Sequence, residues 1–561
     1  MAAVMASATI ADARTPLFRN GKTSYRIVLS PEASMSEKTA AGELQKYICQ
    51  VSGAYIPIEA TAGRHNIFIG WNESCGAPKP ADCDESFTYA CDGRDIRIYG
   101  GSGRGTMYGV FTFLENELGV KWYAPDCTTV PHMDCYTPER FSHTESPALK
   151  YRFAAYYGPI HDPVWMAHNK NNSAFKTVNN EYGNISAYGG AHTFGKFVNR
   201  SEYYDAHPEY YSLNDGKRNS TGQLCLSNPD VLKICIEGLR KEMRENPDYW
   251  VYSLSQNDNM SFCECEHCKA LEDKYGGHSG AILWFVNQAA DAVRDEFPDK
   301  YVGTFAYQYS RKAPVGIVPR DNVVIRLCSI ECEFSHPLNA NEFNRPFMDD
   351  LKKWSSIAPH LFIWDYVVDF AQYVAPFPNF QSLAENIRIF RDHNAIGVME
   401  QAQYNGEGGE FCEMKAWVLT KLLWNPELDT DALVAEFIKA YYGAAAPMVQ
   451  KYFDLCKAQV KDDTVIRFCT REKDPLYSDA FISESLDILQ EARNAVADDP
   501  VLKDRADRVY AQPLYIKVKK DKTGSKADGS MDELIRILNH DTYRMFEWRP
   551  IHEDIRRLQE E

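Results

Sequence analysis

The chain has 561 residues, of which 44% are hydrophobic and 25% charged, a composition typical of a globular protein with two or three domains. Its formal net charge of −17 argues against a protein that binds nucleic acid, because such binding needs a basic surface. No apolar run approaches the roughly 18 residues that a membrane-spanning helix requires.

The chain begins with a short apolar run, MAAVMASATIADA, that ends in small side chains. Signal peptides end in this way, although their basic first region is missing here. We therefore expect residues 1–20 to be a signal-peptide remnant or a disordered end, and we favour a periplasmic or cell-surface location.

Residues 21–147 alternate between strand and helix patterns. A strand at 25–29 precedes a helix that Ser36 caps and that runs to about Ser52. A hairpin turning at Asp92-Gly93 then leads to a second helix over 103–118. The pattern predicts a small α/β domain without a catalytic cluster.

Residues 148–425 repeat a strand followed, in most cases, by a helix. Strands are expected at 149–156, 187–192, 210–213, 250–254, 302–307, 323–327, 361–366 and 396–400. Eight such repeats predict an α/β fold of the (β/α)8 TIM-barrel type. Residues 426–561 read as helical throughout, so we expect a helical C-terminal domain after the barrel.

Three carboxylates stand at the ends of predicted barrel strands, where active sites of this fold lie: Asp258, Asp365 and Glu400. Paired acids on a barrel rim suit glycoside hydrolysis, in which one carboxyl protonates the leaving oxygen. Any one of them could instead cap a helix or form a salt bridge. No cofactor is expected for this chemistry.

Residues at or near the same strand ends are candidate ligands for a glycan. They are Asn257, Tyr307, His192, Glu209, Trp364 and Gln401. The adjacent pair Asn257-Asp258 suits a substrate with a 2-acetamido group, because one side chain can orient the acetamide while the other acts as the acid. The acetamide oxygen then attacks the anomeric carbon, and the enzyme supplies no nucleophile.

Three cysteines lie within six residues, at Cys263, Cys265 and Cys268. This spacing predicts a structural zinc site, with Cys225 as the fourth ligand and His267 as its rival. The alternative is a disulfide with spare thiols.

Several motifs carry a resemblance to known families. The segments TAAGELQKYICQVSG, IFIG and GGSGRGTMYGVFTFLENELGVKWYAP resemble the domain that precedes the barrel in α-glucuronidases and β-hexosaminidases. The segments HPEYYSL, QLCLSNP, SLSQNDNMSFCECEHC and GVMEQAQYNGEGGEF resemble glycoside hydrolase family 163, long described as a domain of unknown function. The resemblance spans roughly Thr39 to Gly443.

This resemblance implies a retaining endo-β-N-acetylglucosaminidase that cuts the chitobiose core of complex N-glycans, in gut bacteria that degrade host glycoproteins. It also implies that Asp258 and Glu400 are site carboxylates. The expected partner is therefore a glycan or glycoprotein substrate.

Two other functions compete with this one. The first is an inverting exo-glycosidase similar to α-glucuronidases, with Asp365 as the base and a basic subsite for the uronate drawn from Arg152, Lys170 or Arg326. The second is a glycan-binding protein on a barrel without activity.

Overall fold

The computed structural model describes residues 15–174, 180–183 and 186–560. The chain forms two compact units. Unit 1 comprises Met1–Trp122, Thr128–Pro147 and Asn179–Asn184, and unit 2 comprises Tyr123–Cys127, Ala148–Val178 and Ile185–Glu561. In the described part of the chain, no helix has the length and hydropathy needed to span a membrane.

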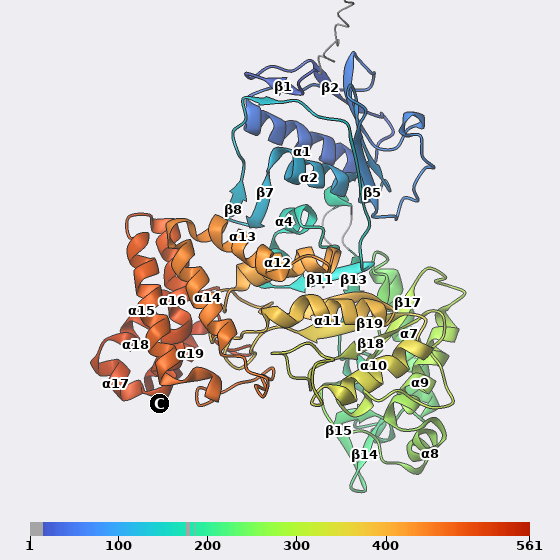
Figure 1. Ribbon diagram of the computed structural model, residues 1–561. Helices are drawn as coiled ribbons and strands as arrows, with labels where there is room; N and C mark the ends of the chain where they lie inside the picture. Colours follow the sequence, from blue (N-terminus) through green and yellow to red (C-terminus); the bar gives the residue numbers. More distant parts are fainter. Residues whose placement is uncertain (1–14, 175–179, 184–185, 561) are drawn as a thin grey trace, which may run out of the picture. The chain divides into compact units, whose positions relative to one another are not determined.

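Unit 1 is the expected small α/β fold, drawn in blue and cyan in Figure 1. Its sheet has the order β10-β5-β6-β4-β2-β3. The strands are β2 (Tyr25–Leu29), β3 (Ile58–Glu59), β4 (His65–Ile69), β5 (Phe87–Cys91), β6 (Ile96–Gly100) and β10 (Phe141–Glu145), and the helices are α1 (Met35–Ser52) and α2 (Gly105–Leu118).

Two details of unit 1 differ from the sequence prediction. Ser34, not Ser36, caps α1, because the Ser34 hydroxyl accepts from Glu37 N–H while the Glu37 carboxylate accepts from Ser34 N–H. Residues 1–14 lie outside the described residues. The expected signal-peptide remnant or disordered end covered residues 1–20. Of these, Phe18–Arg19 form strand β1, which pairs with β9 (Cys135–Tyr136), so residues 18–19 are ordered.

Unit 2 is built on one curled sheet of eight parallel strands. Its order is β11-β20-β19-β18-β17-β16-β13-β12. From β12 to β20 each strand of the sheet therefore lies beside the next one along the chain, and β20 lies beside β11. The strands are β11 (Tyr151–Ala155), β12 (Ser173–Ala174), β13 (Ser186–Gly189), β16 (Val251–Ser253), β17 (Tyr301–Ala306), β18 (Val323–Cys328), β19 (Leu361–Tyr366) and β20 (Ala395–Gln401). Among the described residues no ladder joins the end strands β11 and β12, although Asn172 N–H donates to Arg152 O at 3.2 Å. Complete closure of the barrel stays a prediction.

The segment 210–213 was expected to be a barrel strand, and this prediction is wrong. It forms β14 (Tyr211–Asn214), which pairs antiparallel with β15 (Lys217–Leu224) in a separate two-stranded hairpin. Its place in the sheet is taken by β12, whose two residues are too few to give a periodic signal.

Helices accompany most of the strands, as expected. They are α7 (Pro229–Glu245), α8 (Glu266–Tyr275), α9 (His278–Val293), α10 (Arg345–Ile357), α11 (Phe380–Asp392) and α12 (Cys412–Trp424). The side chain of Asn228 caps α7 by accepting from Asp230 N–H at 2.9 Å. Helix α9 contacts β17, α11 contacts β20 and α12 contacts β11 (Figure 1).

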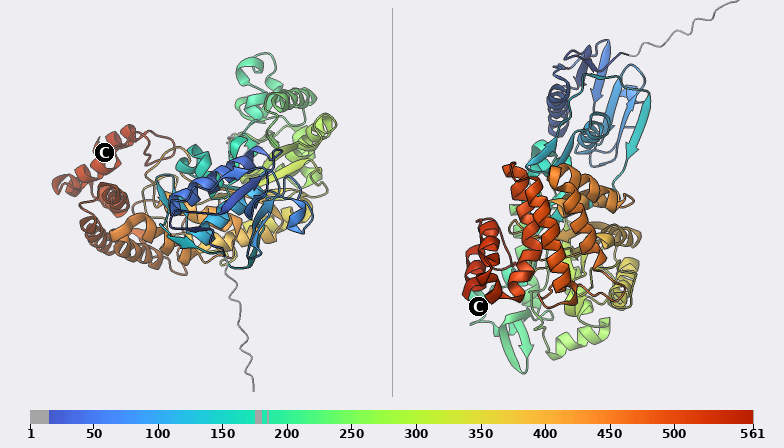
Figure 2. Two further views of the ribbon diagram at one scale, coloured as in Figure 1. Left: turned by 90° about the horizontal axis from the view of Figure 1, so that it is seen from above. Right: turned by 60° about the vertical axis from the view of Figure 1, so that its left-hand side comes forward.

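The C-terminal region is helical, as predicted. It contains α13 (Thr430–Tyr442), α14 (Ala446–Ala458), α15 (Asp479–Ala495), α16 (Pro500–Lys520), α17 (Lys522–Ala527), α18 (Ser530–Leu538) and α19 (Ile551–Glu560). Figure 2 shows α14, α15 and α16 packed side by side.

Between α18 and α19 the chain leaves the helices and returns to the sheet. Arg544 N–H donates to Glu407 O, Tyr373 N–H donates to Met545 O, and Glu547 N–H donates to Phe370 O. These bonds fix residues 543–547 against the loops that follow β19 and β20, and they bring a late segment of the chain to the carboxyl ends of the strands.

Candidate active site

A cavity of about 490 Å³ opens at the carboxyl ends of strands β13, β16, β17, β18, β19 and β20. Its polar lining consists of His192, Asp258, Tyr307, Gln308, Gln401 and Glu547. Its aromatic lining consists of Phe305, Trp364, Tyr366, Phe370, Tyr404, Phe468 and Trp548. Parallel sheets bind ligands at this edge, and flat aromatic faces suit the apolar faces of sugar rings.

Five predicted site residues lie together in this cavity: Asp258, Tyr307, His192, Trp364 and Gln401. Each lies at, near or just after the carboxyl end of its own strand, so the ends of different parallel strands bring them to one place. The strand-end argument therefore leads to residues that line one cavity, and their role in catalysis stays a prediction.

Asp258 is the exposed carboxylate of the cavity and has a fixed partner. The Tyr307 hydroxyl donates to Asp258 Oδ1 at 3.2 Å and accepts from Gln308 Nε2 at 2.9 Å. Burial, together with the charge of Asp258, raises the pKa of Tyr307, so this phenol stays protonated and remains a donor. Gln308 holds a positive φ of 49°, a strained conformation for a residue other than glycine that its neighbours must stabilise.

His192 also adopts a positive φ, of 53°, at the cavity wall. Its Nδ1 lies 2.8 Å from the Gln256 carbonyl oxygen. Because a carbonyl can only accept, Nδ1 carries the hydrogen, which leaves Nε2 able to accept from a ligand hydroxyl.

Glu547 is a second carboxyl in the cavity, and strand-end reasoning missed it. It is 9% exposed, and it accepts from Gln401 Nε2 at 3.4 Å and from the Tyr404 hydroxyl. Burial raises its pKa to about 7, with a further upward contribution from Asp258, against the lowering effect of the Tyr404 bond. A carboxyl with this pKa is poised to donate or accept a proton near neutral pH.

Trp364 helps to set the position of Glu547 through Gln401. The Trp364 indole N–H donates to Gln401 Oε1 at 2.6 Å, which orients the amide so that its nitrogen faces Glu547.

Glu400 and Asp365, the other expected catalytic acids, do not line the cavity. Side chains alternate along a strand, and their neighbours Gln401, Trp364 and Tyr366 face the cavity, so these two carboxyls lie on the opposite face of the sheet. They are 1% and 2% exposed, respectively, and hydrogen-bonded to each other. Burial raises the pKa of Asp365 to about 6 and that of Glu400 well above its usual range.

Asn257 and Glu209 lie outside the cavity lining. The Asn257 amide accepts from Gly195 N–H at 2.8 Å and donates to Gly222 O at 2.8 Å, so both of its polar atoms hold loops in place. Glu209 is exposed and bonds His207 at 3.1 Å.

The basic residues considered for a uronate subsite are also elsewhere. Arg152 is fully buried and donates to the backbone oxygens of Leu149 and Lys170. Arg326 is buried inside the sheet against the Tyr188 ring, 3.3 Å from its centroid. No Lys or Arg occurs among the described residues that line the cavity.

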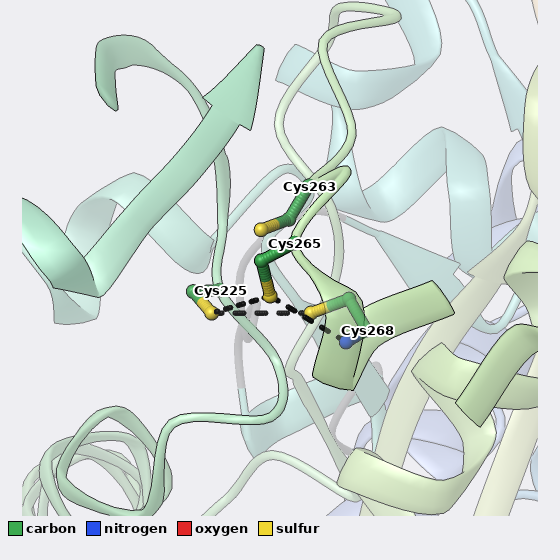
Figure 3. Close-up of side chains that lie close together, drawn as sticks. All are labelled: Cys225, Cys263, Cys265 and Cys268. Atoms are coloured by element: carbon green, nitrogen blue, oxygen red, sulfur yellow. Dashed lines mark hydrogen bonds between the residues drawn. The ribbon is translucent and has the colours of Figure 1, made fainter. Parts of the chain in front are cut away.

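The four predicted metal ligands do come together. The sulfurs of Cys225, Cys263, Cys265 and Cys268 all lie within 4.8 Å of one another, whereas His267 is exposed and outside the group. Figure 3 shows the side chains converging from the end of β15, the loop after β16 and the start of α8.

Residues 122–454 match the family described as a domain of unknown function (DUF4838). This match covers more than half of the chain, so the protein belongs to that family. Glu547 lies beyond the matched residues. No curated protein matches this chain.

Among solved structures, the chain resembles BtGH115A, a family GH115 4-O-methyl-α-glucuronidase with specificity for decorated arabinogalactans. The TM-score is 0.58 at 13% identity, over 95% of this chain and 78% of the other. It also aligns with CpGH84D (TM-score 0.46, 11% identity, 97% and 96% covered) and with the Flavobacterium johnsoniae chitobiase FjGH20 (TM-score 0.44, 12% identity, 97% and 96% covered). The likeness to the glucuronidase shows a shared fold.

Proposed function

We propose that this protein is a glycoside hydrolase, and specifically an endo-β-N-acetylglucosaminidase of the family 163 type that cuts the chitobiose core of complex N-glycans. The observation that carries the proposal is the pairing of two carboxyls, Asp258 and Glu547, in one aromatic-lined cavity at the carboxyl ends of the strands. Glycosidases need one carboxyl that protonates the leaving oxygen and a second polar group that stabilises the charge on the sugar. The fold shared with a glucuronidase supports the same class of reaction.

Glu547 is our choice for the proton donor, because its pKa of about 7 keeps a large fraction protonated near neutral pH. Asp258, held by Tyr307, accepts the N–H of the 2-acetamido group. The acetamide oxygen forms a bond to the anomeric carbon as the glycosidic bond breaks, and the Glu547 proton passes to the leaving oxygen. Water then attacks the anomeric carbon, the bond from that carbon to the acetamide oxygen breaks and restores the acetamide, and the proton of the water passes to the Glu547 carboxylate. Two displacements at one carbon retain its configuration.

The sequence left the acid open between Glu400 and Asp258 and gave Asn257 and Tyr307 as acetamide ligands. The proposal moves the acid to Glu547 and the acetamide ligand to Asp258. Glu400 lies on the far face of its strand, and the Asn257 amide is already engaged with two backbone groups. The site needs no cofactor in this scheme, and a glycoprotein substrate agrees with a periplasmic or cell-surface location.

The exo-acting alternative is less well supported. A uronic acid substrate calls for a cation beside its carboxylate, and the described cavity lining offers no Lys or Arg. The cavity carries the acidic side chain of Asp258 instead, which would repel a uronate.

The test is mass spectrometry of the glycans released from a complex N-glycosylated glycoprotein by the wild-type chain and by Asp258→Asn. Released glycans that end in a single GlcNAc, and that Asp258→Asn no longer releases, are the expected result. Release of single sugars would favour the exo-acting alternative. Binding of the glycoprotein without any release would favour the glycan-binding protein.

A further inference from the structure

We infer that Cys225, Cys263, Cys265 and Cys268 form a structural zinc site that fixes the turn carrying Asp258. The inference about the metal rests on the geometry of the four thiols and stands independently of the proposed hydrolase activity.

The distances between the sulfurs fit a single tetrahedral ion. Cys225 Sγ lies 3.7 Å from Cys265 Sγ and 3.9 Å from Cys268 Sγ. Four sulfurs at the usual Zn–S distance of about 2.3 Å would be about 3.8 Å apart in a tetrahedron. In Figure 3 the four sulfur atoms gather around one space.

The same two distances exclude a disulfide that joins Cys225 to Cys265 or to Cys268. A disulfide needs sulfurs about 2.05 Å apart. All sixteen cysteines of the chain fall in the described residues, and each is a free thiol. A set of four thiol ligands, of which Cys225, Cys263 and Cys268 are buried and Cys265 is half-buried, is the arrangement of a closed structural site.

The surroundings supply the donors that thiolates bound to a metal require. Leu213 N–H donates to Cys263 Sγ at 3.3 Å, and Cys268 N–H donates to Cys265 Sγ at 3.5 Å. The Arg218 guanidinium hydrogen-bonds Cys225, and its positive charge offsets part of the negative charge of four thiolates around one divalent ion. Such outer contacts orient ligands and tune a metal site.

The site joins two segments that together hold Asp258. Cys225 directly follows β15, and two residues before it Gln223 binds the turn on both sides of Asp258. Gln223 Nε2 donates to the carbonyls of Asn257 and Asn259 at 2.8 Å each, and Gln223 Oε1 accepts from Asn257 N–H at 2.8 Å. The other ligands begin five residues after Asp258, so a metal at the cluster would close a loop around the carboxylate.

The experiment is elemental analysis of the purified full-length chain after dialysis against metal-free buffer. We expect about one zinc per chain in the wild type, less than about a tenth of that in Cys225→Ser and Cys268→Ser, and an unchanged content in Cys235→Ser. Cys235 is a buried thiol of α7 outside the cluster and serves as the matched control. Zinc below one-tenth per chain, or one iron per chain, would overturn the inference.

A second measurement keeps the inference testable if the ligand variants do not fold. The wild-type chain, unfolded without reductant in the presence of a chelator, should titrate as sixteen free thiols. Chain produced with cobalt in place of zinc should show the intense absorption of thiolate-to-cobalt charge transfer. Two or more missing thiols, with no charge-transfer band, would show a disulfide in place of the metal.

Discussion

The amide of Gln401 donates a hydrogen bond of 3.4 Å to the carboxylate of Glu547, and so joins the last strand of the sheet to the segment between α18 and α19. The C-terminal region therefore contributes to the cavity as well as to the packing of unit 2. A carboxyl that lies beyond the family-matched residues becomes part of the candidate site. We expect truncation before α18 to remove activity even where the sheet still folds.

Glu547→Gln removes the candidate proton donor but keeps its shape. We expect kcat on an N-glycoprotein to fall by a factor of about 10² to 10⁴. In the wild type, kcat/KM should decline as pH rises through about 7, because the donor must be protonated and the Glu547 pKa is about 7. The variant should lose this decline. Glu484→Gln, at an exposed position of α15, is the control. An unchanged pH profile in Glu547→Gln would reject the assignment.

Tyr307→Phe removes the hydroxyl that donates to Asp258. A hydrogen bond to a charged group contributes about 1.5 to 3 kcal/mol, so kcat should fall by roughly 10- to 100-fold while the fold is kept. Tyr309→Phe, two residues away and outside the cavity lining, should leave kcat unchanged. Equal rates for Tyr307→Phe and the wild type in a steady-state assay would show that the Tyr307 bond is only structural.

Gln223→Leu removes the bonds that hold the turn around Asp258 while keeping a buried side chain of similar size. We expect kcat to fall by about 10²-fold, because a misplacement near 1 Å in a catalytic group has an effect of this order. Zinc content should not change, which separates loss of positioning from loss of metal. Gln288→Leu is the matched control, because the Gln288 amide donates to the Trp284 carbonyl of its own helix. Wild-type kcat in Gln223→Leu would contradict the positioning role.

Glu410→Gln breaks a buried ion pair with Lys415. Lys415 Nζ lies 2.8 Å from Glu410 Oε2, and the two side chains are 0% and 5% exposed, respectively. Leaving the ammonium without its carboxylate should lower stability by about 3 kcal/mol and Tm by about 2 to 4 °C. Calorimetry checks this, with Glu342→Gln at the exposed pair to Arg345 as the control. The control should change Tm by less than about 1 °C, because exposed ion pairs contribute little to stability. An equally small change in Glu410→Gln would show that the buried pair does not stabilise the fold.

Much of the fold followed from the sequence, because long β-rich runs and amphipathic helices have clear periods. The strands at 302–307, 323–327 and 361–366 correspond closely to β17, β18 and β19. The failures have local causes. The hairpin at 211–224 has strand composition but pairs only with itself, and β12 is too short to give a period.

Only part of the candidate site could be predicted from the sequence, and the limit again has a physical cause. Position at a strand end brings Asp258 and Tyr307 to the cavity lining, but it does not decide which face a strand residue occupies. Glu400 and Gln401 are adjacent, and a shift of one residue separates the outer face from the cavity. Glu547 follows no strand, and only the backbone bonds of residues 543–547 bring it to the sheet.

The most direct test compares initial rates of glycan release by wild type, Asp258→Asn, Glu547→Gln and Glu400→Gln under one set of conditions. The structure predicts a large loss for Asp258→Asn and Glu547→Gln, whose side chains line the cavity. It predicts at least about a third of the wild-type rate for Glu400→Gln, because an amide there can still donate to Asp365. Full loss in Glu400→Gln, with activity kept in Glu547→Gln, would contradict the assignment of the cavity as the active site.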